Sequence, residues 1–198
     1  MNYGVIILRA QPFHVGHISV IRQMVDECDK VLIIIGSKNK SGTIRNPFDY
    51  RIRKRMVNEA LCDARIDLGK VKIAGLPDWS MEDAYKLVHE WGNYLYYNVV
   101  SQIEQKEFAI YYNDDAATVK NWFVDDLESR VEIRSVDRTR IESEVSDISS
   151  SKVRQALLKG DNKYLKRALT PSVYAMKKDL AEILKKVEEN PQEDFIMK

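Results

Sequence analysis

The sequence contains few of the residues that mark disulfide-rich, fibrous or membrane-embedded proteins. It has two cysteines, five prolines and eight glycines among 198 residues. The cysteines, Cys28 and Cys62, are too few for a disulfide scaffold and lack metal-ligand spacing, so we expect reduced thiols in a cytoplasmic protein. The longest apolar run, Val31–Ile35, is much shorter than a bilayer span, and residues 1–5 lack the basic flank of a signal peptide. We therefore expect no membrane partner.

The length of the chain and its shares of hydrophobic and charged residues predict a globular domain of ordinary size. Hydrophobic residues make up 44% of the chain and charged residues 31%, which excludes a disordered chain. We expect one domain over residues 1–170, a C-terminal helix packed on it over 171–190, and a tail over 191–198.

Charge is nearly balanced over the whole chain but not along it. The net charge is +1, whereas residues 37–55 carry seven basic side chains and only one acidic side chain, Asp49. A local basic segment in a neutral protein fits a compact anion such as a nucleotide phosphate better than a long polyanion. We therefore expect no nucleic-acid partner. A solvated helix face would give the same charge pattern.

Short apolar segments alternate with segments of helical periodicity. The short segments predict strands over residues 3–8, 30–35, 71–76, 108–112 and 131–136. Helices are predicted over 16–29, 47–62, 81–105 with an interruption near Gly92, 116–127, 149–159 and 171–188. This alternation indicates a doubly wound, Rossmann-like α/β fold with a parallel five-stranded sheet and helices on both faces. In such a fold the ligand binds beyond the carboxyl ends of the strands.

The segment after the first predicted strand has the composition of an anion site. It runs from Arg9 to His17 and contains neither GxGxxG nor a P-loop pattern. Free amides at a helix start bind anions, and Gly16 permits close approach of a phosphate to the backbone. His14 and His17 can donate hydrogen bonds to phosphate oxygens, and Arg9 adds a positive charge.

This first block resembles a known signature. The stretch Arg9-x-Gln11-Pro12-Phe13-His14-x-Gly16-His17 is similar to the HxGH motif of the nucleotidylyltransferase superfamily. It looks most like the nicotinamide mononucleotide adenylyltransferases of the archaeal type, whose relatives also occur fused to Nudix hydrolases. The resemblance implies catalytic roles for His14 and His17, and ATP binding by Arg9, Gln11, Phe13 and Gly16. Leu8 stands where that family usually has glycine. No Nudix box occurs, so we expect a stand-alone transferase domain.

A second block follows the second predicted strand. Ile35-Gly36-Ser37 and Ile44-Arg45-Asn46-Pro47-Phe48 are similar to the family's "IGS…IR[ND]PF" segment. The resemblance implies that Arg45 reaches the nucleotide phosphates. Arg53 matches the arginine of a Glu-Arg pair, but Ile52 replaces the glutamate. A structural role and a functional role for Arg53 both stay open.

A third block lies late in the chain. Residues 147–154 read Asp-Ile-Ser-Ser-Ser-Lys-Val-Arg and resemble the superfamily's "IS[ST]xx[IV]R" motif. Hydroxyl side chains cap helix starts and leave amides available for phosphates. The resemblance implies ATP binding by Ser149, Ser150 and Lys152 and a catalytic role for Arg154.

The acceptor site is expected in the middle of the chain. Related enzymes stack a tryptophan of the long middle helix on the pyridine ring, which favours Trp91 and then Trp79. Packing of either indole in the core is an equally good interpretation. Asn113 follows the fourth predicted strand and is a candidate polar contact, although the family's usual glycine is missing there.

The resemblance implies adenylyl transfer from ATP to nicotinamide mononucleotide by a homo-oligomer, with Mg²⁺ bound to the ATP. The HxGH and serine blocks are shared with enzymes that act on phosphopantetheine, flavin, cytidylyl or nicotinic acid mononucleotide acceptors. A module that binds NAD or ATP without turnover is the alternative from another class.

Overall fold

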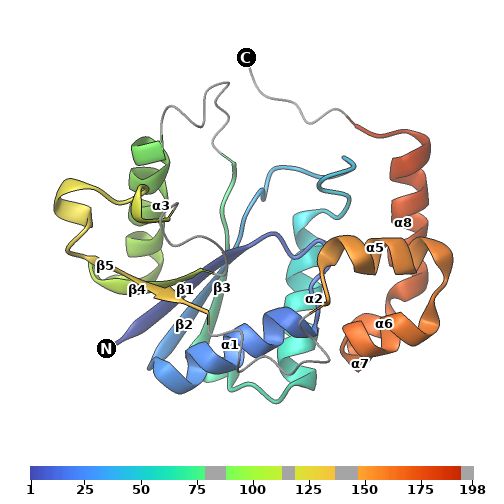
Figure 1. Cartoon of the computed structure of the whole chain (residues 1–198), viewed down its shortest axis with the longest axis horizontal. Helices are drawn as coiled ribbons and strands as arrows, with labels where there is room; N and C mark the ends of the chain where they lie inside the picture. The colour runs from blue at the N-terminus through green and yellow to red at the C-terminus, as the bar shows by residue number, and fades with distance from the viewer. Residues whose placement is uncertain (79–87, 113–118, 137–146, 193–198) are drawn as a thin grey trace.

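The computed structural model describes residues 1–78, 88–112, 119–136 and 147–192, and the predictions for Trp79 and Asn113 lie outside this part. Figure 1 shows a central sheet flanked by helices. The strand order is β3 (Val71–Gly75), β2 (Lys30–Ile35), β1 (Tyr3–Leu8), β4 (Phe108–Tyr112) and β5 (Val131–Ser135). Every hydrogen-bonded pair of strands is parallel, which confirms the predicted Rossmann-like α/β fold.

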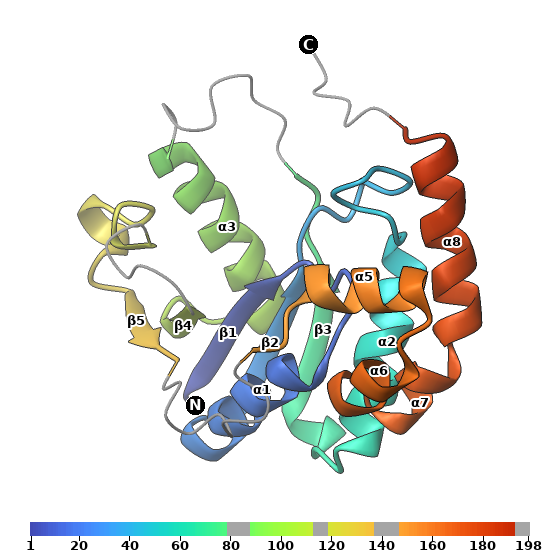
Figure 2. The same ribbon diagram turned by 45° about the vertical axis from the view of Figure 1, so that its right-hand side comes forward.

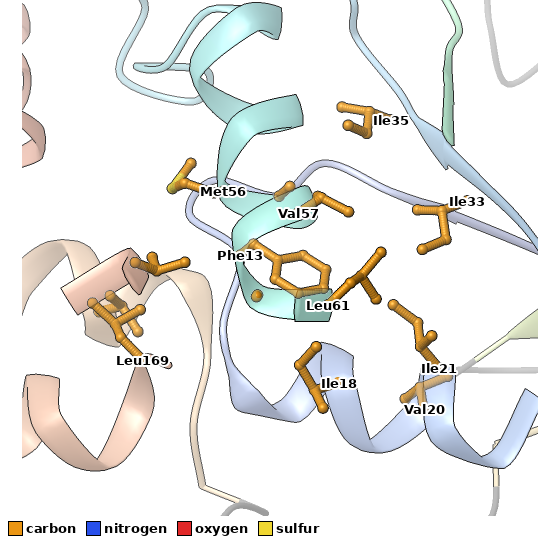
Figure 3. Packing of buried hydrophobic residues seen from close by; sticks show 14 of the residues in the cluster. Phe13, Ile18, Val20, Ile21, Ile33, Ile35, Met56, Val57, Leu61 and Leu169 are labelled. Atoms are coloured by element: carbon orange, nitrogen blue, oxygen red, sulfur yellow. The ribbon is translucent and has the colours of Figure 1, made fainter. Parts of the chain in front are cut away.

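Alternate strand residues enter hydrophobic cores on opposite faces of the sheet. On one face, Ile33 packs in a cluster with side chains of α1 (Val15–Glu27) and α2 (Tyr50–Asp63), as Figure 3 shows. On the other face, Leu32 packs with side chains of α3 (Val88–Ile103). The prediction of helices on both faces is therefore confirmed. Within the described ranges, no helix is long and apolar enough to cross a membrane.

The register aligns the carboxyl ends of the three strands that matter most here. Leu8 of β1 pairs with Ile35 of β2, and Ile35 pairs with Gly75 of β3. The segments that follow these strands consequently emerge at one edge of the sheet. Helix α2 begins at Tyr50 rather than at the expected Pro47, because the Asp49 side chain caps it by accepting a hydrogen bond from the Ile52 amide over 2.8 Å.

The C-terminal region departs from its prediction. Helix α5 (Ser150–Lys159) matches, but α6 (Asn162–Ala168) was not expected. The single helix expected over 171–190 is wrong, because the chain forms α7 (Pro171–Ala175) and α8 (Lys177–Glu189) with a break at Met176. Helix α7 packs against α2 and α8 packs against α5, and the break lets both contacts form. Figure 2 shows these helices grouped beside α2.

Two predictions in the middle of the chain also need correction. The interruption near Gly92 is absent, and α3 continues through this residue. Glycine is required there because a Cβ atom would overlap the main-chain carbonyl of Trp122. The helix expected to reach residue 127 ends by Lys120 in the described chain, and residues 125–127 form the 3-10 helix η2 (Asp125–Leu127). Asp125 has a φ of +53°, which an α-helix does not accommodate.

Candidate functional site

The first and third sequence blocks meet at the carboxyl ends of β1 and β2, next to the start of α5 (Figure 2). The Arg154 Nη1 atom donates a hydrogen bond to the Gln11 carbonyl over 2.6 Å. The Ser150 hydroxyl donates to the Pro12 carbonyl over 3.0 Å. Side chains predicted from a late motif are therefore bonded to the backbone of the first block.

The two histidines of the first block stack on each other at the start of α1. His14 is the N-cap residue of α1, and its ring centroid lies 3.8 Å from that of His17. The His14 amide donates a hydrogen bond to His17 Nδ1 over 3.1 Å. Because Nδ1 accepts this bond, a neutral His17 carries its proton on Nε2. His17 therefore presents an Nε2–H donor at this position.

Burial keeps both histidines uncharged near pH 7. Burial lowers the pKa of His14 to about 4. Burial holds the pKa of His17 well below its usual value, and repulsion by the protonated form of His14 lowers it further. The Nδ1 atom of His14 is buried and has no hydrogen-bond partner within the described part of the chain. A buried polar atom of this kind is costly unless a ligand satisfies it.

Gln11 joins the first and second blocks. Its side chain is only 2% exposed, and both of its polar atoms bind the main chain of Phe48. Nε2 donates to the Phe48 carbonyl over 3.1 Å, and Oε1 accepts from the Phe48 amide over 3.0 Å. We call this reciprocal pair the Gln11 clamp. Because Nε2 and Oε1 of Gln11 both bond Phe48, the clamp holds the segment after β1 against the segment before α2.

The other predicted ATP-binding residues of the first block occupy different environments. The Phe13 ring is fully buried in the core (Figure 3) and stacks on His17 with the ring centroids 4.9 Å apart. Gly16 lies in the first turn of α1. Arg9 is exposed just beyond β1.

The start of α5 is built as its sequence predicts. The Ser149 hydroxyl caps the helix by accepting a hydrogen bond from the Lys152 amide over 3.3 Å. The Lys152 ammonium donates to the Asp147 carbonyl over 2.9 Å. Arg154 is half-buried, and burial lowers its pKa. Its Nη2 atom reaches the Ser151 hydroxyl over 3.3 Å. An arginine with five N–H donors has donors left for a phosphate after these bonds.

Arg45 lies on an exposed loop that the C-terminal segment touches. Its side chain is exposed, and it forms no ion pair with a described residue. Within the same loop, the Asn46 amide donates to the Thr43 hydroxyl over 2.9 Å. The Gln192 amide, just after α8, donates to the Gly42 carbonyl over 2.9 Å. The tail is therefore bonded to this loop as far as Gln192.

Arg53 lies in the interior of the protein. Its side chain is fully buried, and its guanidinium donates to the carbonyls of Arg9, Gly36 and Ser37 over 3.1, 2.7 and 2.9 Å. Its Nε atom donates to the Asp49 carbonyl over 3.3 Å. Burial lowers the pKa of Arg53. The family motif pairs this arginine with a glutamate. In this chain the Arg53 guanidinium instead donates its hydrogen bonds to main-chain carbonyls.

An aromatic cluster lies near the carboxyl end of β4. Trp91 of α3 is partly buried, and its ring lies edge-on to Trp122 with the centroids 6.4 Å apart. Tyr112, the last residue of β4, packs edge-on against the same indole at 5.7 Å. Tyr94 completes the cluster at 5.7 Å from Trp91. The structure thus places Trp91 at the edge of the sheet that binds ligands in this fold.

Sequence reasoning assigned neither Tyr94 nor Tyr112 to this cluster, and it also missed Trp122. Its position shortly after the fourth strand was the available signal, because segments after strands form the ligand edge. Trp79 and Asn113, the other predicted acceptor-binding residues, lie outside the described residues.

The described residues contain no group of three or more histidine, cysteine, aspartate or glutamate side chains that could hold a metal ion. The charged side chains of the first and third blocks are arginines, a lysine and Asp147, and the Asp147 carboxylate already accepts a hydrogen bond from Arg167. This donor set fits a divalent cation that is held mainly by the oxygens of a bound phosphate, with water in the remaining positions.

Comparisons with known proteins show which proteins this chain is similar to. The nicotinamide-nucleotide adenylyltransferase of Saccharolobus solfataricus is 35% identical over 85 residues, which span 43% of this chain and 49% of that protein. Nicotinamide-nucleotide adenylyltransferase 1 of Sulfolobus acidocaldarius is 43% identical over 65 residues, or 33% of this chain and 37% of that protein.

A solved structure extends the similarity over nearly the whole chain. It is a bifunctional NMN adenylyltransferase/ADP ribose pyrophosphatase from Francisella tularensis, complexed with AMP and a manganese ion. The match has a TM-score of 0.69 and 25% identity, and it covers 96% of this chain and 52% of that chain. The similar regions thus span about half the length, or less, of these relatives. The family described as Cytidylyltransferase-like matches residues 9–156. Because this match spans most of the chain, the protein belongs to the Cytidylyltransferase-like family.

Proposed function

We propose that the protein transfers the adenylyl group of ATP to nicotinamide mononucleotide, giving NAD and pyrophosphate. The contact between the histidine block and the start of α5 carries this proposal. It gathers His14, His17 and Arg154 beyond the carboxyl ends of the strands, where this class of fold binds nucleotides. The names of the similar archaeal proteins support the choice of reaction.

The reaction needs no protein nucleophile. An oxygen of the 5′-phosphate of nicotinamide mononucleotide attacks the α-phosphorus of ATP, and the bond from that phosphorus to the bridging β-oxygen breaks. Pyrophosphate leaves with the electron pair. Because the attacking phosphate is already an anion, no general base is required. The work of the protein is positioning and stabilisation of developing charge.

The side chains divide this work by charge. The neutral histidines donate hydrogen bonds to the triphosphate, His17 through its Nε2–H. Arg9, Arg45 and Arg154 supply the positive charge that holds the leaving pyrophosphate. Further contacts to ATP come from the helix starts, at Gly16, Ser149, Ser150 and Lys152. Gln11 and Phe13 act through the backbone that they hold in place.

The aromatic cluster is the acceptor side of the site. Trp91 is partly buried and has Trp122 beside it, so one of these indoles can stack on a pyridine ring while the other supports it. Trp79 and Asn113 remain part of this proposal. Mg²⁺ bound with ATP would neutralise phosphate charge, and Arg9, Arg45 and Arg154 would share that role.

Pyrophosphate release tests the proposal directly. The purified protein is supplied with ATP, Mg²⁺ and one acceptor at a time: nicotinamide mononucleotide, nicotinic acid mononucleotide, phosphopantetheine or flavin mononucleotide. Release with the first acceptor, with NAD as the product, is the expected result. Release with another acceptor alone would keep the chemistry and overturn the acceptor. Nucleotide binding without any release would favour a sensing module.

Two further properties belong to the proposal. Synthesis of NAD from ATP fits a cytoplasmic protein, and the free thiols of Cys28 and Cys62 support this location. The resemblance also implies a homo-oligomer, which light scattering on the purified protein would test.

A further inference from the structure

Arg53 is a buried cation beneath the proposed site. Its side chain is fully buried, and it forms no ion pair with a carboxylate of the described residues. A buried charge costs free energy unless hydrogen bonds compensate it, and here main-chain carbonyls supply that compensation. At position 53 the side chain must therefore donate hydrogen bonds to these carbonyls as well as fill the space.

The guanidinium joins the ends of two neighbouring strands. Its Nη1 atom bonds the Arg9 carbonyl after β1 and the Gly36 carbonyl after β2, and its Nη2 atom bonds the Ser37 carbonyl. A planar group with five donors in a rigid fork fixes the relative positions of these carbonyls. Lysine has a single nitrogen and cannot reproduce this geometry.

The backbone at these points is strained. Ala10 follows the Arg9 carbonyl and has a φ of +53°, and Ser37 has a φ of +49°. Residues other than glycine adopt this left-handed region at a cost and keep it only where the surroundings impose it. Ala10 and Ser37, the two strained residues, therefore lie at or next to the carbonyls that Arg53 binds.

Each bond also fixes the plane of a peptide group. In a planar trans peptide the carbonyl and the N–H point in opposite directions. Binding of the Arg9 carbonyl therefore turns the Ala10 amide away from Arg53, and binding of the Gly36 carbonyl does the same for the Ser37 amide. Arg53 thus sets the direction of backbone donors in both segments.

We infer that Arg53 is a positioning residue of the ATP site, which fixes the segments that carry Arg9 and Arg45 without touching the nucleotide. This inference rests on the proposed function. The Gln11 clamp ties the same two segments together at Phe48, so Arg53 and the clamp form one frame.

The test compares two variants of Arg53 with a matched control on the same helix. Arg53→Lys keeps the charge and loses the fork. Arg53→Gln loses both, and it avoids burying a charge, so it is expected to fold even where the lysine variant does not. Met56→Ala is the control, because Met56 is fully buried on α2 and packs only in the hydrophobic core. Thermal unfolding and steady-state kinetics are measured for all three, at a temperature where each is folded.

Loss of positioning has a specific kinetic signature. We expect kcat/KM for ATP to fall on the order of 100-fold in both Arg53 variants, the scale of a misplacement of about 1 Å. The KM for nicotinamide mononucleotide should change little, because the acceptor cluster lies on the β4 side. Met56→Ala should lower the melting temperature and leave kcat/KM for ATP near that of the unmodified protein.

Three results would overturn the inference. Wild-type kinetics in both Arg53 variants would show that the frame is dispensable. Wild-type kinetics in Arg53→Lys alone would show that charge suffices and geometry does not matter. An equal loss of kcat/KM in Met56→Ala would show that any loss of stability has this effect.

The unmodified protein separates this inference from the proposed function. If it releases no pyrophosphate with any acceptor, the proposed function fails, and calorimetric titration with ATP becomes the test of Arg53. Binding that is about tenfold weaker in both Arg53 variants than in the unmodified protein and Met56→Ala would support the inference. Equal affinities, or no binding of ATP by the unmodified protein, would overturn it.

Discussion

The stacked histidines illustrate how one hydrogen bond sets the chemistry of a residue. The His14 amide occupies His17 Nδ1, and burial keeps the His17 ring neutral, so its Nε2–H is a donor. His17→Ala removes the donor that we assign to the triphosphate in the proposed site. We expect turnover to fall by a factor on the order of 10²–10⁴, the range for one lost transition-state donor. Steady-state pyrophosphate release measures the effect.

A conservative variant and a distant histidine make this prediction specific. His17→Gln places an amide N–H near the position of Nε2 and should recover part of the activity. His89→Ala changes an exposed histidine of α3 and should leave turnover unchanged. Turnover close to normal in His17→Ala would contradict the role given to this donor.

The sequence identified the histidines and Arg154 as candidates but could not show how the side chains are used. Arg53 and Gln11 bind main-chain groups contributed by distant segments. Such bonds depend on tertiary structure, which residue type and spacing alone do not reveal. The replacement of a glutamate by Ile52 signalled only that Arg53 had another partner.

At the scale of elements, the Gln11 clamp connects the segment after β1 to the segment before α2. Gln11→Ala would leave the Phe48 amide and carbonyl buried without partners. We expect a loss of about 2–3 kcal/mol in the free energy of unfolding, the cost of such unsatisfied groups. Urea denaturation measures this loss. If the Gln11 side chain instead bound ATP directly, Gln11→Ala would raise the KM for ATP and leave the free energy of unfolding unchanged.

The contact between α3 and Trp122 depends on the absence of a side chain. Gly92→Ala would force a Cβ atom into the main-chain carbonyl of Trp122. Overpacking against backbone relaxes poorly, so we expect a destabilisation of about 3 kcal/mol. Asn93→Ala, at an exposed position of the same helix, is the control. Equal urea midpoints for both variants would contradict the close approach.

Sequence reasoning located strands better than short helices, and the reason is physical. Strands β2 and β4 are almost wholly buried, so their apolar runs stand out in the sequence. The predicted ends of all five strands agree with the structure within one residue. Helices α6 and α7 have seven and five residues, too few for a periodic pattern. The break at Met176 lets α7 and α8 pack against different helices, and no local signal marks it.

At the scale of the whole molecule, the proposed site is assembled from opposite ends of the chain. Arg9 and Arg154 belong to blocks that only the doubly wound topology brings together. Topology follows from the alternation of strands and helices, so the meeting of the blocks could be predicted from the sequence. The acceptor side could be predicted only in part, because the helix predicted over residues 116–127 did not indicate that Trp122 lies beside Trp91.

The buried histidines also make the stability of the whole protein depend on pH. An unfolded histidine has a pKa near 6.5, whereas the pKa of His14 in the fold is about 4. Between these values the unfolded state binds a proton that the folded state does not. Stability is therefore fully present above pH 6.5 and declines as the pH falls towards 4. The difference corresponds to about 3 kcal/mol for His14 alone, and His17 shifts in the same direction.

Urea denaturation of the nucleotide-free protein between pH 7 and pH 4 measures this decline. His14→Asn is the matched variant, because it removes one of the two titrating rings and should flatten the profile. Carboxylates dominate only at lower pH, as for Glu132, where the hydrogen bonds from Arg134 lower the pKa. A profile that is already flat in the unmodified protein would show that the histidines are not held neutral. That result would also remove the basis for treating His17 as a neutral donor to the triphosphate.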